Sequence, residues 1–117
     1  RAAFVSPGRQ QYHASACKAW VNFNGIGVLA IRASYNVSSV TDGGVGIYTV
    51  NFTTAFSTAD YGIVAVGMQD DGTGTSGMHI DNDVPPTASA CRLDSINAAG
   101  SAYVDSPFNG AAFFGDQ

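Results

Sequence analysis

The chain has 117 residues and a mass of 12.1 kDa, which fits one domain and leaves no room for separate catalytic and binding domains. It holds 14 Gly, 17 Ala and 19 Ser or Thr, but only two Leu, one Lys and no Glu, so an all-α fold is excluded. The net charge is −4 and the five basic residues are scattered, which disfavours binding to nucleic acid or to anionic lipid.

The first half of the chain predicts a leading segment followed by four strands. Residues 1–16 show no sustained period and contain a Pro-Gly turn signal, so we expect them to lead into the domain without forming a strand. From Cys17 onward apolar and polar residues alternate, which is typical of a strand with one buried face. Glycine-rich turns then separate extended, β-branched runs. The strands expected in this half are 17–24, 28–33, 35–40 and 47–53.

The second half continues the β pattern. Residues 61–68 are apolar nearly throughout, which predicts a strand covered on both faces. Residues 69–77 are rich in Asp and Gly and indicate a surface loop. Further short strands are expected at 78–82, 90–96, 102–105 and 111–114. The whole pattern predicts an all-β fold, a single antiparallel sandwich or barrel-like domain over residues 17–117.

Neither the ends of the chain nor its cysteines indicate targeting or a cofactor. No apolar run reaches the roughly 20 residues of a membrane span, and the N-terminus lacks the order of a signal peptide. Cys17 and Cys91 form no CxxC pair and no zinc-type spacing. We expect two free, packed thiols without a disulfide, although a single bridge between them is the alternative. No cofactor is expected.

Carboxylate chemistry has few candidates in this chain. A glycosidase needs two carboxyl groups, and without Glu they must come from nine Asp, as in the pairs Asp70–Asp71 and Asp81–Asp83. A solvated acidic loop is the simpler interpretation, so we predict no enzyme. His79, Asp81 and Asp83 alternate, and an extended backbone would project all three from one face as a weak candidate metal site.

Exposed aromatic rings are a further way to bind sugars. Trp20 shares its side of the strand with Lys18, Asn22 and Asn24, and we favour a core or subunit contact for it over a sugar-stacking role. Tyr12, Tyr35 and Tyr103 are other candidates for stacking.

Three segments, in the same order along the chain, carry a resemblance to a known family. They are residues 18–25 (KAWVNFNG), 30–42 (AIRASYNVSSVTD) and 48–55 (YTVNFTTA). They resemble a sequence found at the C-terminal end of bacteriophage tail fibre proteins, in particular those of phages that infect Acinetobacter. Residues 112–115 resemble the short apolar closing strand of that family.

This resemblance implies a homotrimeric distal tip, located in the virion tail fibre after synthesis in the host cytoplasm. The tip would attach the phage to capsular or other surface polysaccharide, without nucleic-acid binding, membrane insertion or catalysis. Residues 1–16 would then continue from the fibre shaft. One alternative is a domain that only trimerises and caps the fibre, and a lesser one is a polysaccharide depolymerase using Asp81 and Asp83.

Residues 69–86 depart most from the family pattern, which suggests a variable recognition loop. The candidate receptor-binding residues are Asp70, Asp71, Thr73, His79, Asp81, Asp83 and Tyr103. The candidate trimer-interface residues are Trp20, Val64 and Val66.

Overall fold

Eight β-strands make up the regular structure in the part of the chain that the computed structural model describes, residues 9, 12–68, 77–97 and 99–117. The strands are β1 (Cys17–Asn24), β2 (Ala30–Tyr35), β3 (Val37–Gly44), β4 (Ile47–Phe52), β5 (Gly62–Met68), β6 (Gly77–Ile80), β7 (Ala90–Ile96) and β8 (Phe108–Phe114). Their β-branched and aromatic residues fit a pleated, half-buried surface.

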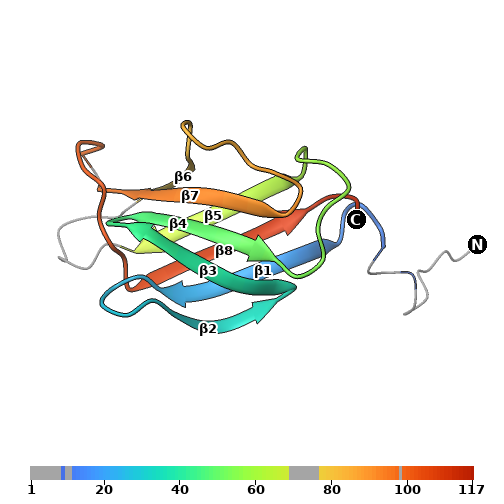
Figure 1. Ribbon diagram of the computed structural model, residues 1–117, viewed down its shortest axis with the longest axis horizontal. Coiled ribbons are helices and arrows are strands. Elements are labelled where there is room, and N and C mark those ends of the chain that lie inside the picture. Colours follow the sequence, from blue (N-terminus) through green and yellow to red (C-terminus); the bar gives the residue numbers. More distant parts are fainter. Residues whose placement is uncertain (1–8, 10–11, 69–76, 98) are drawn as a thin grey trace, which may run out of the picture.

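The strands form two four-stranded antiparallel sheets that pack face to face (Figure 1). The first sheet has the order β2-β1-β8-β5, and the second sheet has the order β3-β4-β7-β6. After the two N-terminal hairpins β5 joins the first sheet, β6 and β7 join the second, and β8 returns to the first to lie between β1 and β5. The predicted all-β sandwich is therefore confirmed.

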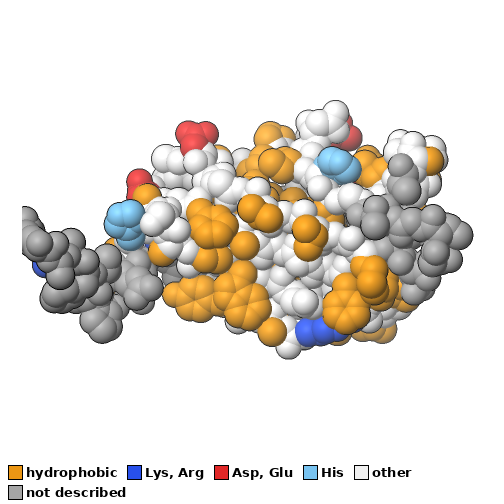
Figure 2. All heavy atoms as spheres, turned by 180° about the vertical axis from the view of Figure 1, so that it is seen from behind, with side chains coloured by type: hydrophobic (Ala, Val, Ile, Leu, Met, Phe, Trp, Pro, Cys, Tyr) orange, Lys and Arg blue, Asp and Glu red, His pale blue; other side chains and the backbone are white. Residues whose placement is uncertain are grey.

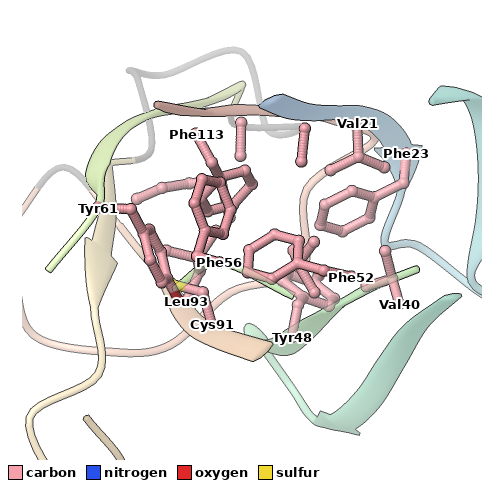
Figure 3. Close-up of a cluster of buried hydrophobic side chains, with 14 residues drawn as sticks. Val21, Phe23, Val40, Tyr48, Phe52, Phe56, Tyr61, Cys91, Leu93 and Phe113 are labelled. Carbon is pink, nitrogen blue, oxygen red and sulfur yellow. The ribbon is translucent and has the colours of Figure 1, made fainter. Parts of the chain in front are cut away.

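Side chains from the two inner faces meet in an aromatic core (Figure 3). Alternation in β1 buries Ala19, Val21 and Phe23, as the sequence pattern predicts. The ring of Phe52, from the second sheet, lies edge-on to Phe113 of the first sheet, with centroids 4.9 Å apart. Such aromatic pairs contribute about 0.5–1.5 kcal/mol each beyond the burial of their surface, so these contacts hold the sheets together.

Asn36 alone connects β2 in the first sheet to β3 in the second. Its backbone is left-handed, with φ of 55°, a conformation that Asn tolerates better than most residues. The side-chain Nδ2 donates to the carbonyl oxygens of Lys18 and Thr54, both at 3.0 Å, and Oδ1 accepts from Thr54 N at 2.7 Å. One residue therefore ties three segments together at this corner.

The two ends of the sandwich differ in what they carry (Figure 1). At one end, which we call the base, β1 begins and β8 finishes near the C-terminus. At the opposite end, which we call the far end, lie the β1–β2 and β3–β4 turns and the connection from β7 to β8. The described chain therefore enters and leaves the sandwich at the base.

Some strand predictions need correction. Residues 61–68 are not covered on both faces, because Gly62, Val64, Val66 and Met68 of β5 are exposed in the single chain. The strand expected at 102–105 is reduced to an isolated bridge between Tyr103 and Ile96. β6 ends at Ile80, because the next residues form a turn around the carboxylate of Asp81.

Candidate assembly face and binding sites

The outer face of the first sheet carries a largely apolar surface, with Asn22 as a polar residue beside Gly110. Strand register places Trp20 between Tyr35 and Ala112, and Ala112 is in turn beside Val64. In the neighbouring rows Val66 pairs with Gly110, and Phe108 pairs with Met68. We call these residues the apolar face: Trp20, Tyr35, Val64, Val66, Met68, Phe108, Gly110 and Ala112.

This face carries almost no charged side chains that would favour its exposure to water. The four strands of the first sheet contain no acidic residue, and their only cations are Lys18 and Arg32. Lys18 is buried and its Nζ donates to the carbonyl oxygen of Gly115, while the Arg32 guanidinium lies 4.0 Å above the Phe108 ring. Figure 2 shows hydrophobic side chains gathered over this side of the molecule.

The structure brings together the three residues predicted for a trimer interface. Trp20 is 40% exposed, Val64 59% and Val66 64%, and all three belong to the apolar face. Monomeric soluble proteins rarely expose large contiguous apolar patches, whereas obligate interfaces are built from them. The arrangement is therefore suited to contact with another protein surface.

Two buried carboxyl groups lie on the outer side of the second sheet. Asp81 and Asp94 are only 3% and 4% exposed. Asp81 Oδ2 forms an ion pair with Arg92 Nε at 2.8 Å, and Asp81 Oδ1 accepts backbone N–H bonds from Asp83 at 2.6 Å and Val84 at 3.2 Å. Asp81 is thus a structural anchor for the turn after β6, and the prediction that it contacts a receptor is not supported by its burial.

Their surroundings shift the pKa values of the two carboxyl groups in opposite directions. Burial opposes the charge of Asp81, but the N–H groups of Asp83 and Val84, Asp94 and the Arg92 guanidinium together hold its pKa below the ordinary value. Burial and the neighbouring Asp81 raise the pKa of Asp94 to about 6. Near neutral pH the pair therefore holds a proton far more readily than two separate Asp would.

The other candidate receptor-binding residues do not form one described cluster. His79 is exposed on β6, and Asp83 is exposed in the turn that follows. Tyr103 is exposed beside the last residue of β7. Asp70, Asp71 and Thr73 lie outside the residues that the structure describes.

The geometry required for a metal site at residues 79–83 is not present. The backbone leaves the strand at Ile80, so the three side chains do not alternate along one extended face. Within the described part of the chain, no group of three or more His, Cys, Asp or Glu side chains is arranged to hold a metal ion. Cys17 and Cys91 are both free, and Cys91 is buried in the core.

A hollow of about 470 Å³ lies at the corner where β2 turns into β3. We call it the tyrosine hollow, and it is lined by Tyr12, Tyr35, Asn36, Thr53, Thr54 and Gln117. The sequence marked Tyr12 and Tyr35 as aromatic candidates, but gave no sign that they share a site. Their partners come from separate segments, which only the corner at Asn36 brings together.

No protein family, curated protein or solved structure matches the chain. The described residues include no helix with the length and apolar character needed to cross a membrane.

Proposed function

We propose that this chain is the receptor-binding tip of a phage tail fibre, which assembles as a homotrimer and attaches the virion to host surface polysaccharide. The apolar face is the observation that carries the proposal. It supplies the surface that three copies need in order to associate, and it contains Trp20, Val64 and Val66. The segments that resemble tail fibre ends supply the biological setting.

Association through this face has a clear driving force. Burying apolar surface contributes about 25 cal/mol per Å² removed from water, and the first sheet presents few charges that would need to be desolvated. A closed cyclic arrangement buries the same patch on every subunit. It leaves no unpaired patch through which a filament could grow. An interface between copies would then account for the small number of charged residues in the chain.

The two ends of the sandwich define how the proposed tip is oriented relative to the virion. In this proposal the shaft joins at the base, where β1 begins, so the far end points away from the virion. Tyr103 and the exposed β1–β2 and β3–β4 turns would then be presented outward. Three copies multiply weak individual contacts by avidity, which can strengthen binding by about 10² to 10⁴.

Sedimentation of the purified chain tests the assembly. The wild type should sediment at three times the chain mass, and Val66→Asp should sediment as a monomer with an unchanged far-ultraviolet circular dichroism spectrum. Val45→Asp is the matched control, because Val45 is exposed to a similar extent (60% against 64%) but lies in the β3–β4 turn, outside the apolar face. A wild type that is monomeric at micromolar concentration would contradict the proposal.

Competition with phage tests the attachment. Purified chain added before a phage that carries this tip should reduce adsorption to its host cells, and monomeric Val66→Asp should compete about 10² times more weakly. No competition by the wild-type trimer would overturn the receptor-binding role.

A second candidate function is a trimerisation cap without recognition, because the apolar face alone would suffice for it. Exchanging residues 69–76 discriminates between the two, since the exchange leaves β6 and the buried Asp81 in place. A pure cap keeps the host range unchanged, whereas a recognition tip changes it if this loop contributes to the contact.

A further inference from the structure

The tyrosine hollow has the size and the chemistry of a small-ligand site. Its volume of about 470 Å³ lies in the range of roughly 300–1,000 Å³ that is typical of ligand pockets. It combines two aromatic rings, from Tyr12 and Tyr35, with hydroxyl groups from the two Thr and amide groups from Asn36 and Gln117.

The lining contains no charged side chain, which restricts the ligand class. Anions and cations would find no opposite charge among the lining side chains, and a purely apolar ligand would leave hydroxyl groups without partners. A sugar ring satisfies both kinds of group, because its hydroxyls exchange hydrogen bonds with hydroxyls and amides while its C–H faces pack on aromatic rings.

The polar wall of the hollow is held in place by hydrogen bonds that do not use its hydroxyl groups. Asn36 fixes the backbone of Thr54 through Oδ1 and Nδ2, and Thr53 N donates to the Asn36 carbonyl oxygen at 3.1 Å. Gln117 Nε2 donates to the Thr54 carbonyl oxygen at 3.0 Å. A site with a fixed backbone loses less entropy when a ligand binds.

The hydroxyl groups themselves are left available. Among the hydrogen bonds of the described residues, none uses the side-chain hydroxyls of Tyr12, Tyr35, Thr53 or Thr54. Tyr12, Thr53 and Thr54 are exposed and take no part in the hydrophobic core. These side chains are therefore not explained by folding.

We propose that the tyrosine hollow binds one neutral sugar residue of the surface polysaccharide. This inference rests on the proposed attachment function and adds a site that lies away from the 69–86 segment and from Tyr103. The Tyr12 ring packs on the sugar, Tyr35 forms the wall that the hollow shares with the apolar face, and the Thr53, Thr54 and Gln117 side chains exchange hydrogen bonds with the sugar hydroxyls. The hollow lies at the base, where β2 turns into β3, so a trimer would present three such sites around the end that joins the shaft.

The experiment uses oligosaccharides obtained by partial hydrolysis of purified host capsule, titrated into the full chain and followed by NMR or calorimetry. Tyr12→Ala should weaken the affinity by about tenfold, which corresponds to the loss of one aromatic contact. Thr53→Val, which removes a hydroxyl at nearly constant shape, should also weaken it. Tyr103→Ala is the control, because it removes an exposed tyrosine outside the hollow. Tyr35 is left intact because it also belongs to the apolar face.

The possible outcomes separate this inference from the function on which it rests. If wild-type chain blocks phage adsorption and binds the oligosaccharides, but Tyr12→Ala and Thr53→Val bind as tightly as the wild type, the hollow is not the site and the attachment function stands. Loss of affinity in Tyr103→Ala alone would place the site at the far end and overturn the inference. If the wild-type trimer neither blocks adsorption nor binds the oligosaccharides, both proposals fail.

Discussion

Replacing Gly46 with Ala provides a stringent test of how the β3–β4 turn packs. Gly46 has φ of +68°, and an added Cβ would lie 2.6 Å from the Ser95 carbonyl oxygen and 2.8 Å from Val104 N. Both are backbone atoms, and they are tied to each other by a hydrogen bond of 3.0 Å from Val104 N to Ser95 O. Neither atom can move aside without disturbing the end of β7.

Gly27 is the matched control for this substitution. It has the same φ of +68°, but an added Cβ would meet nothing within 4 Å. An Ala at either position has the same backbone penalty, about 1–2 kcal/mol for the left-handed conformation. The difference between the two variants therefore isolates the crowding at Gly46.

The size of that difference follows from the contacts. Overpacking costs about 1–3 kcal/mol. Gly46 also accepts from Ser95 N at 2.7 Å and donates to Asp105 Oδ1 at 2.8 Å, and weakening these two bonds costs about 1 kcal/mol each. We expect Gly46→Ala to lose about 4–7 kcal/mol of unfolding free energy and Gly27→Ala about 1–2 kcal/mol, a difference of about 3–5 kcal/mol.

Urea unfolding followed by circular dichroism measures both variants. All samples need one protein concentration, because the proposed assembly would make the apparent stability depend on concentration. Losses that agree within about 0.5 kcal/mol would show that the segment around Val104 does not pack on Gly46, and would refute the reasoning.

Three further predictions concern single side chains. Burial, followed by Asp81, raises the pKa of Asp94 from 3.8 to about 6, so its stabilising contribution is present below pH 3.8 and is lost as the pH rises through 6. Thermal unfolding should show that Asp94→Asn removes this loss between about pH 4 and about pH 7; an unchanged pH profile would contradict the coupling. Asn36→Gly keeps the backbone conformation but deletes three side-chain hydrogen bonds, and should lower the unfolding free energy by about 1–3 kcal/mol. Burial raises the pKa of the Cys91 thiol to about 11, so iodoacetamide at pH 8 should modify Cys91 only after unfolding, as peptide mass spectrometry would show.

Strand alternation made much of the sandwich predictable. In β1 the buried residues Ala19, Val21 and Phe23 are local in sequence, so their period gives both the strand and its inner face. The prediction for β5 was wrong, because apolar residues on both sides of a strand do not require that a single chain covers both sides. In the structure the second side is the exposed part of the apolar face.

The sites were less predictable because they depend on contacts between distant segments. The ion pair between Asp81 and Arg92 requires the antiparallel pairing of β6 and β7, and without it Asp81 looked like an exposed loop residue. The tyrosine hollow joins residues as far apart as Tyr12 and Gln117. Trp20, Val64 and Val66 lie on one face because β1 and β5 both pair with β8, and strand alternation within each segment does not give that pairing.

The return of β8 to the base has a consequence for how this domain can be changed. Since β1 starts and β8 stops at the same end, every far-end segment is an internal connection between two anchored strands. Insertions into such connections lengthen a surface loop without displacing either strand, and the entropic cost of a longer loop grows only slowly with its length. The far-end segments can therefore be lengthened or exchanged without moving the strand ends at the base or, in the proposed trimer, the contacts between copies.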